Sequence, residues 1–322
     1  MRRIAALAII LSAPISAQPV AQPLQDALRA RIGDFQGTVS LYAKNLETGE
    51  SVGIRPSEPV RTASTIKLPI LLTVFEQVSA GKAKWTEPLT VTPQDKVSGS
   101  GIVGSELSDG VQLPLRDVVH LMIVLSDNSA TNMILERFTA DAVNAYLDKI
   151  GIKTTRSMRK VRGDGTQLKA AEGWSTAGKL PENQKYGLGV STPREMVAIL
   201  EKLDRGEIVN PEASREVLAI LKRCRDDSGI RRRLSGLTVA NKTGALDALR
   251  SDVALVYSKG GHIAMAITVD DMPKPDWSPE NAGSILIADL AKILVDGLAP
   301  GVYILSVGTN ELRRSVRLIV DQ

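Results

Sequence analysis

A serine and a lysine stand three residues apart in Ser64-Thr65-Ile66-Lys67, at the start of an apolar stretch with the period of a helix. On a helix, residues at this spacing share a face with Cβ atoms ~5–6 Å apart, so we expect the Lys67 amine to reach the Ser64 hydroxyl. Burial beside other cations lowers the pKa of a lysine and leaves an amine that can accept a proton. The pair therefore predicts a nucleophilic serine with a lysine base.

Histidine is a poor alternative base in this chain, which has only two of them. His120 lies inside the apolar run 118–122, a setting typical of a helix histidine whose partners are satisfied, and His262 begins a predicted strand. A Ser-His-Asp triad is numerically possible but poorly placed. A serine nucleophile here needs a lysine.

Two further motifs supply groups of the same chemistry. Ser126-Asp127-Asn128 directly follows an apolar helix, and Lys242-Thr243-Gly244 ends a strand where glycine lets a substrate backbone approach closely. Together and in this order, the three motifs resemble those of class A serine β-lactamases and penicillin-binding proteins. The resemblance covers most of the chain, from about Leu24 to Leu298.

The resemblance implies the catalytic roles. Ser64 would attack the carbonyl of a β-lactam or an acyl-D-Ala bond and form an acyl-enzyme, while Lys67 would take the serine proton. Ser126 would relay a proton to the leaving nitrogen, helped by Lys242. No cofactor and no metal is implied.

The same resemblance assigns the groups that hold the substrate. Asn128 would bind the substrate amide, and the backbone N–H groups of Ser64 and Ala245 would form the oxyanion hole beside Gly244.

A substrate carboxylate would be received by Lys242 and Thr243. Arg250, eight residues after Lys242, would add a bidentate clamp to that carboxylate, or would instead pair with Asp252 or a surface acid.

One family signature is missing. Class A β-lactamases carry Glu-x-x-Leu-Asn, whose Glu activates the water that releases the acyl group. Between residues 150 and 193 the acids are Asp164, Glu172 and Glu182, and none has Leu-Asn three residues on. Glu172 and Glu182 are candidate bases in a differently shaped loop, although we favour solvated loop charges.

Three functions remain open. The leading interpretation is a serine β-lactamase that hydrolyses the β-lactam amide. The second is a D-Ala-D-Ala peptidase of the penicillin-binding protein type, and the third is a module that binds β-lactam or peptidoglycan stem peptide without turnover. The missing signature favours the second and third, and the class A-like order of motifs favours the first.

The elements that must position these groups change in character along the chain. Strand patterns occupy 37–55 and helical periods follow the serine motif, whereas three strand patterns and a final helix occupy 237–298. This order predicts an α+β fold, an antiparallel sheet flanked by helices with an inserted all-helical lobe. We expect the α/β part at about 24–62 and 190–298, the lobe at about 63–189, a long loop at 163–189, and an extra C-terminal β-hairpin at 299–322.

The N-terminus has the order of a secretory signal peptide, with Arg2 and Arg3 before an apolar run and small residues up to Ala17. We expect cleavage near Ala17, a secreted or periplasmic domain from residue 18, and no stable membrane anchor. Loss of the two arginines reduces the formal charge from +4 to +2.

Composition excludes several other classes. A single cysteine, Cys224, cannot build a disulfide framework, and a Cys/His zinc site would need nearly every candidate ligand. An aromatic content of 3% argues against base-stacking platforms. We therefore expect no nucleic-acid partner. The resemblance implies a small-molecule β-lactam or a peptidoglycan stem peptide as the partner, and we expect a monomer.

Overall fold

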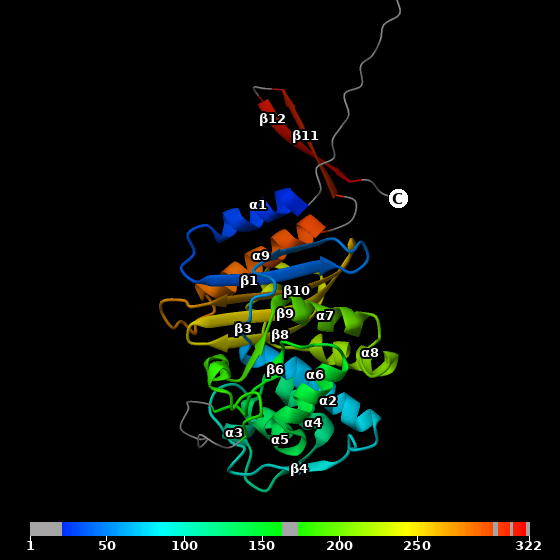
Figure 1. Ribbon diagram of the computed structural model, residues 1–322, viewed down its shortest axis with the longest axis vertical. Coiled ribbons are helices and arrows are strands. Elements are labelled where there is room, and N and C mark those ends of the chain that lie inside the picture. The colour runs from blue at the N-terminus through cyan, green and yellow to red at the C-terminus, as the bar shows by residue number, and fades with distance from the viewer. Residues whose placement is uncertain (1–20, 163–172, 299–301, 310–311, 320–322) are drawn as a thin grey trace, which may run out of the picture.

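A five-stranded antiparallel sheet forms the centre of the molecule in the computed structural model, which describes residues 21–162, 173–298, 302–309 and 312–319 (Figure 1). Its strands lie in the order β2-β1-β10-β9-β8. Their bounds are Ser51–Ile54 for β2, Thr38–Asn45 for β1, Gly261–Asp270 for β10, Leu249–Ser258 for β9 and Thr238–Leu246 for β8. The motif strand β8 is thus at an edge, where alternate backbone N–H groups have no strand partner.

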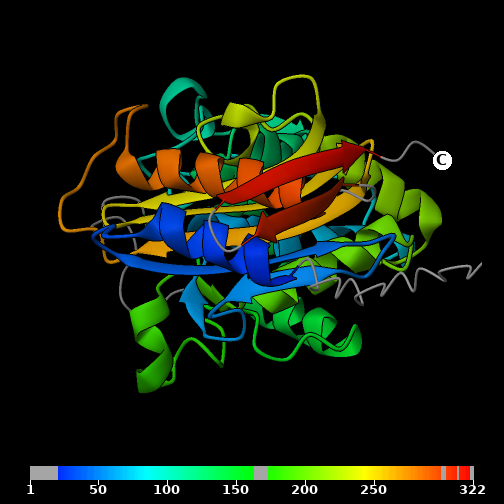
Figure 2. The same ribbon diagram turned by 90° about the horizontal axis from the view of Figure 1, so that it is seen from above.

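Two helices cover one face of this sheet. They are α1 (Ala21–Ile32) and α9 (Ala282–Leu298), which lie side by side above it in Figure 1 and in front of it in Figure 2. The strands point large apolar side chains at them, as Ile263, Met265 and Ile267 of β10 illustrate. Because side chains alternate along a strand, the neighbouring Ala264 and Ala266 face the opposite way.

The second core lies on that opposite face, between the sheet and the helical lobe. The helix α7 packs against β10 and β1, and small residues such as Ala264 let it approach closely. Below it, α2 is buried at the centre of the lobe. The helices on this side are α2 (Lys67–Ser79), α3 (Val103–Glu106), α4 (Leu115–Val124), α5 (Asn128–Phe138), α6 (Ala140–Lys149), α7 (Pro193–Asp204) and α8 (Pro211–Leu221).

The predicted α+β class and the antiparallel sheet are confirmed, but the lobe is not purely helical. Short strands pair within and beside it: β4 (Pro88–Thr90) with β5 (Gln112–Pro114), and β3 (Val60–Arg61) and β6 (Arg156–Ser157) with β7 (Gly189–Ser191). The described residues also include the 3₁₀ turns η1 (Ala63–Ile66), η2 (Pro181–Tyr186) and η3 (Ile230–Arg233). These short pairs are too brief for sequence periodicity to reveal them.

The expected C-terminal hairpin consists of β11 (Val302–Thr309) and β12 (Leu312–Ile319). The two strands pair with each other in a sheet of their own and do not extend the five-stranded sheet. Within the described part of the chain, no helix has the length and apolar character needed to cross a bilayer.

Candidate active site

The first motif lies where the edge of the sheet meets the lobe. Ser64 is on the 3₁₀ turn η1, directly before α2, and its side chain is partly exposed. The preceding Ala63 has a left-handed φ of 45°, a strained conformation of the kind found at functional sites. A Cβ added to Gly244 of β8 would lie 2.9 Å from the Ser64 backbone nitrogen, so only glycine lets β8 approach this turn so closely.

Lys67 is fully buried at the start of α2. Its Nζ donates to the Ser126 carbonyl oxygen at 2.7 Å and to Asn128 Oδ1 at 2.9 Å, and it lies 3.3 Å from Ser126 Oγ. Burial, and then the charge of Lys242, hold the pKa of the Lys67 amine well below its ordinary value, although Asp127 acts in the opposite direction. Lys67 therefore has the environment expected of a lysine base.

The direct contact expected between Lys67 and Ser64 is not formed. Within the described residues, the Ser64 hydroxyl makes no hydrogen bond, and Lys67 turns to the second motif instead. A 3₁₀ turn also places residues three apart on one face, so spacing is not the reason. The Lys67 amine instead directs its hydrogen bonds to the Ser126 carbonyl oxygen and to Asn128 Oδ1.

The second motif is fixed by the aspartate between its two functional residues. Asp127 caps α5 by accepting from Ala130 N at 2.8 Å, and its other oxygen accepts from Ile102 N at 2.6 Å and Val103 N at 2.8 Å. Ser126 is thereby held at a left-handed φ of 55°.

The loop before α3 is the second support of this motif. Asn128 donates from its backbone N to Ser100 O at 2.9 Å and from Nδ2 to Ser98 O at 3.2 Å. Sequence analysis assigned no role to this loop or to Asp127. The clustered serines and glycines of Ser98-Gly99-Ser100-Gly101 were the signal that could have indicated a functional loop.

The third motif reaches the same hydroxyl from the other side. The fully buried Lys242 donates to Ser126 Oγ at 2.9 Å and to the Thr243 carbonyl oxygen at 2.8 Å. Burial lowers its pKa, while Cys224, Asp226 and Asp252 act in the opposite direction. Ser126 Oγ therefore lies between two lysines that are far apart in the sequence, which is the arrangement a proton relay requires.

The pKa values of two acids near Lys242, Asp252 and Asp226, are shifted in opposite directions. Burial raises the pKa of Asp252 to about 7, although hydrogen bonds from Ile230 N and Asn241 act the other way. Partial desolvation by the surrounding protein would raise the pKa of Asp226, although its side chain is exposed to solvent, but hydrogen bonds from Ser228 and Thr243 and the charge of Lys242 hold the pKa below the ordinary value. Sequence reasoning did not identify Asp226, because nothing local in the sequence signals its contact with Thr243.

Arg250 is held mainly by the backbone. Its guanidinium donates to Leu246 O at 2.6 Å, to Leu249 O at 2.7 Å and to Asp276 O, and it lies over the Trp277 ring. The predicted alternative of a pair with Asp252 is wrong, because that carboxylate is buried and bonded to Ile230 N and Asn241.

Among the described residues of the segment beside α5, the one that Asn132 holds is a valine and not an acid. Asn132, one turn beyond Asn128, accepts from Val161 N at 2.8 Å and donates to Val161 O at 3.0 Å. The candidate base Glu182 is exposed on η2. Asp164 and Glu172 lie outside the described residues. An apolar valine is therefore the residue that α5 fixes next to the site.

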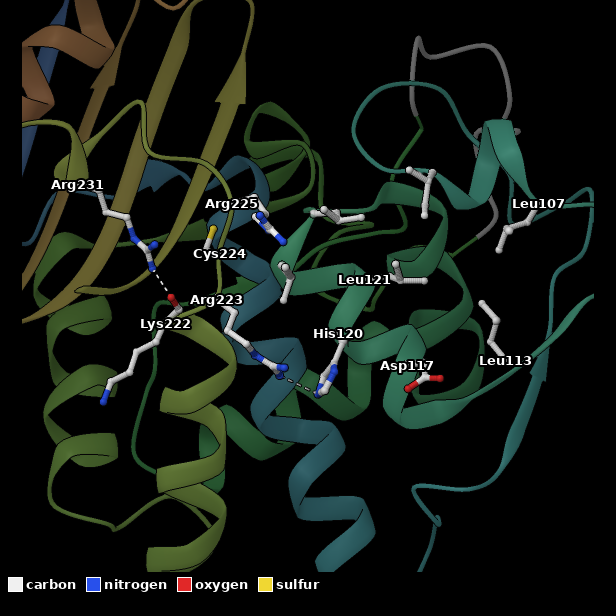
Figure 3. Close-up of a pocket in the computed structure, with 13 residues that line it drawn as sticks. Leu107, Leu113, Asp117, His120, Leu121, Lys222, Arg223, Cys224, Arg225 and Arg231 are labelled. Atoms are coloured by element: carbon white, nitrogen blue, oxygen red, sulfur yellow. Dashed lines mark hydrogen bonds between the residues drawn. The ribbon is translucent and has the colours of Figure 1, made fainter. Parts of the chain in front are cut away.

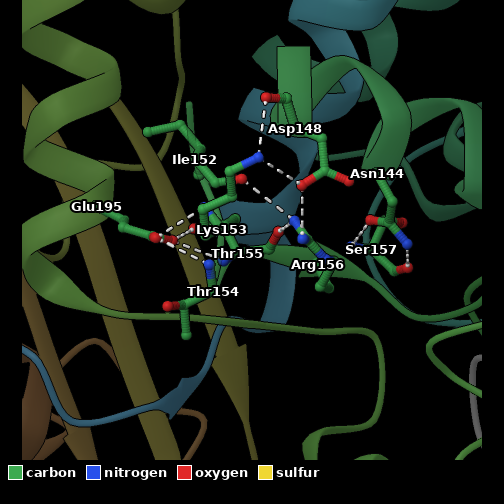
Figure 4. A network of polar contacts seen from close by, with 9 residues as sticks. All are labelled: Asn144, Asp148, Ile152, Lys153, Thr154, Thr155, Arg156, Ser157 and Glu195. Atoms are coloured by element: carbon green, nitrogen blue, oxygen red, sulfur yellow. Dashed lines mark hydrogen bonds and ion pairs between the residues drawn. The ribbon is translucent and has the colours of Figure 1, made fainter. Parts of the chain in front are cut away.

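A polar network anchors the start of this segment (Figure 4). The Glu195 carboxylate of α7 accepts from the backbone N of Lys153, Thr154 and Thr155 at 2.9, 2.8 and 2.6 Å, and from Thr155 Oγ1 at 2.6 Å. Burial alone would raise the pKa of Glu195, but these bonds outweigh it and hold the pKa below the ordinary value.

Neither histidine takes part in the site. His120 Nε2 lies 3.3 Å from an Arg223 nitrogen, and His262 Nδ1 is 2.8 Å from an Asp204 oxygen. In the described ranges, no three His, Cys, Asp or Glu side chains are grouped so that they could hold a metal ion.

Comparison with known proteins decides the family. The chain matches the beta-lactamase enzyme family over residues 23–298, which is most of its length. The chain belongs to this family. The predicted resemblance is thus confirmed, and the antiparallel sheet with its helical lobe is the fold of class A beta-lactamase structures.

Relatives of this beta-lactamase-family chain include a protein named as a regulator and proteins named as beta-lactamases. The beta-lactamase regulatory protein BlaB of Streptomyces cacaoi is 25% identical over 88% of this chain and 99% of its own length. The beta-lactamase SME-1 of Serratia marcescens is 25% identical over 70% of this chain and 73% of its own.

The similar solved structures include both a beta-lactamase and PBP-A. The beta-lactamase from Sphaerobacter thermophilus has a TM-score of 0.72 at 26% identity, covering 85% of this chain and 96% of its own. PBP-A has a TM-score of 0.71 at 26% identity, covering 85% and 95%. A leucine-to-glutamate variant of PBP-A, with the same similarity, is an acyl-enzyme complex with penicillin G.

Proposed function

We propose that this beta-lactamase-family chain is a serine hydrolase that β-lactams acylate at Ser64 and that releases the acyl group slowly, as penicillin-binding proteins do. The observation that carries the proposal is the shared hydroxyl of Ser126, which lies 3.3 Å from Lys67 Nζ and 2.9 Å from Lys242 Nζ. Val161 supports the slow release, since α5 holds an apolar residue and not an acid at its contact with the neighbouring segment.

The proposed acylation uses the lowered pKa of Lys67. A neutral amine has two N–H donors, which match the Ser126 carbonyl and Asn128 Oδ1, and one lone pair that can accept a proton. The Ser64 oxygen attacks the amide carbonyl as its proton passes to Lys67, which requires the amine to turn from the second motif towards Ser64 when substrate binds. Ser126 then gives its proton to the leaving nitrogen and is reprotonated from Lys67, while Lys242 steadies the Ser126 oxygen.

Substrate binding is proposed for the edge of β8. The backbone N–H groups of Ser64 and Ala245 would stabilise the oxyanion, because the glycine at position 244 brings strand and turn together. Lys242 and Thr243 would hold the carboxylate and Asn128 the amide. Three backbone carbonyls already occupy Arg250, so a carboxylate clamp would have to use its remaining N–H groups.

Intact-protein mass spectrometry during incubation with benzylpenicillin, beside turnover of a chromogenic cephalosporin, tests the proposal. We expect a lasting mass increase of one penicillin per chain, lost in Ser64→Ala, with slow turnover. Fast turnover would favour the leading sequence interpretation, a β-lactamase, and Glu172→Gln and Glu182→Gln would then test the two candidate bases. A folded protein that shows neither adduct nor turnover contradicts both.

A second candidate function rests on one observation. The similarity to BlaB extends over 99% of that protein, which is named as a regulatory protein. A chain that acts by binding alone would retain affinity for β-lactam or stem peptide in Ser64→Ala. Acylation of the wild type, and release of D-Ala from an acyl-D-Ala-D-Ala peptide, would distinguish the enzyme from such a module.

We propose further that the mature protein begins near residue 18, is located outside the cytoplasm, and acts as a monomer. The basic and apolar order of residues 1–17 supports export. The mass of the protein recovered from the producing cell's periplasm or medium tests cleavage, and sedimentation tests the monomer.

A further inference from the structure

A pocket of about 810 Å³ lies beside the proposed active site and shares none of its catalytic residues. It opens between α4 and the segment that follows α8, and Figure 3 shows its lining side chains. Two of its lining residues connect it to the catalytic groups. Leu125 directly precedes Ser126 in the sequence, and Cys224 is close enough to Lys242 to affect its pKa. The pocket is thus a neighbour of the catalytic groups, and its volume suits a small organic molecule.

The floor of the pocket is apolar and partly open to solvent. Leu107, Leu113 and Leu121 line it, and each is only partly buried, while Ile102 at the rim is 40% exposed. Apolar area of this kind gains about 25 cal/mol for each Å² removed from water. The floor therefore favours an occupant with an apolar body.

The rim of the pocket is cationic. Its charged residues are Lys222, Arg223, Arg225 and Arg231 against the single carboxylate of Asp117, which pairs with Arg116 at 3.5 Å.

Not all four cations are free to bind a ligand. Lys222 lies over the Tyr257 ring, and Arg231 donates to the backbone carbonyls of Leu221, Lys222 and Val239. Arg223 and Arg225 remain, and neither forms an ion pair with a carboxylate among the described residues.

His120 contacts Arg223 in the pocket without neutralising its charge. Arg223 reaches toward His120, with nitrogens 3.3 Å apart (Figure 3). Burial, followed by Arg223 and Arg116, lowers the pKa of His120, so the imidazole is neutral at pH 7 and accepts a hydrogen bond. The guanidinium retains its charge and further N–H donors for an anion.

We propose that this pocket binds a small organic anion with an apolar body, which places its charged group between Arg223 and Arg225 and its apolar part on the leucines. The site is separate from the acylation of Ser64, and its occupation does not require an acyl-enzyme. The pairing of a cationic rim with an apolar floor excludes neutral and cationic ligands of the same shape as preferred occupants.

Fluorescence titration with 8-anilinonaphthalene-1-sulfonate, an apolar sulfonate, tests the proposal on the whole folded protein. We expect saturable binding at one site, weakened at least tenfold in Arg223→Glu and in Arg225→Glu. Arg215→Glu is the matched control, because Arg215 is exposed on α8 and does not line the pocket. Circular dichroism and the thermal midpoint of each variant establish that it is folded.

The single cysteine gives a second readout that does not depend on fluorescence. Because Cys224 lines the pocket, the bound sulfonate should slow its reaction with a thiol reagent in wild type and in Arg215→Glu, but not in Arg223→Glu. The neutral amine N-phenyl-1-naphthylamine should bind at least tenfold more weakly than the sulfonate.

Several outcomes would overturn the proposal. Equal binding of the neutral amine and the sulfonate would remove the role of charge, and an equal effect of Arg215→Glu would remove this location. Loss of sulfonate binding after acylation by benzylpenicillin would place the probe in the catalytic cleft. Binding in Ser64→Ala is expected to be unchanged, so failure here and failure of acylation are distinguishable.

Discussion

The chemistry of the proposed site depends on two buried, desolvated lysines, Lys67 and Lys242. Lys67 and Lys242 are both fully buried and share Ser126 Oγ, so each experiences desolvation, and Lys67 also experiences the charge of its neighbour. Both effects lower the pKa of Lys67, since they disfavour its charged form. A neutral amine is therefore available in a site that has no usable histidine.

The lowered pKa of Lys67 predicts how acylation depends on pH. Protonation of Lys67 removes the base, so the acylation rate should fall as the pH decreases through that lowered pKa and should level off above it. Lys67→Arg keeps the charge but cannot lose its proton, so a loss of about 10²–10⁴-fold is expected. Stopped-flow acylation with a chromogenic cephalosporin measures both.

The control for this prediction is Lys292→Arg, an exposed lysine of α9, which should acylate like the wild type. A Lys67→Arg protein that is folded and acylates at the wild-type rate would exclude Lys67 as the base.

Asp226 puts a negative charge beside the proposed carboxylate-binding pair. Since its pKa is below the ordinary value, it is ionised at pH 7 and opposes a substrate carboxylate at Thr243. Asp226→Asn should raise acylation efficiency with benzylpenicillin about fivefold, equivalent to about 1 kcal/mol, and less at high salt. Asp227→Asn is the neighbouring control, and an equal effect of both variants would contradict the assignment.

At the scale of elements, loops and helix starts position the catalytic groups. The capping aspartate of α5 ties Ser126 and Asn128 to the start of α3, and Glu195 ties residues 153–155 to α7. Each of these helices also carries a local cap: Asp127 accepts from Ala130 N at the start of α5, and Thr192 accepts from Glu195 N at the start of α7. The partners of these helix starts lie 24 to 42 residues away and have no local signature.

The Glu195 network predicts a pH-dependent loss of stability. Because the folded-state pKa is lowered, the stabilisation is present above the ordinary glutamate pKa and is lost as the pH falls through the lowered value. Glu195→Gln should reduce the free energy of unfolding by about 1–3 kcal/mol at pH 7, as expected for hydrogen bonds to a charged group. Urea unfolding at pH 7 and at pH 3 measures it.

Glu212→Gln, also in the first turn of a helix, should have little effect. A difference between Glu195→Gln and wild type that is as large at pH 3 as at pH 7 would contradict the role of the charge.

At the scale of the whole molecule, the proposed site lies where the edge of the sheet meets the helical lobe. The sheet contributes Lys242 from its edge, and the lobe contributes Lys67 and Ser126, so neither part alone assembles the relay. Asn45 of β1 also donates to Leu298 O at 2.7 Å, which joins the end of α9 to the sheet.

The C-terminal hairpin is predicted to be dispensable for acylation. It forms its own two-stranded sheet, and the family match ends at residue 298. A protein ending at Leu298, which retains the Asn45 contact, should acylate at the wild-type rate and unfold at a similar temperature. Mass spectrometry and thermal unfolding test this, and a folded truncated protein that fails to acylate would assign the hairpin a part in the reaction.

The sequence by itself determined the α+β class and the three motifs, because helical and strand periods and short motifs depend on residues that are close along the chain. Only the tertiary structure decided which groups meet. It placed Lys67 against Ser126 instead of Ser64, set Val161 beside Asn132, and used Arg250 to hold backbone carbonyls. Those partners lie up to 59 residues apart, and Lys242 lies 116 residues from Ser126. Burial, which shifts the lysine pKa values, exists only once the cores have packed.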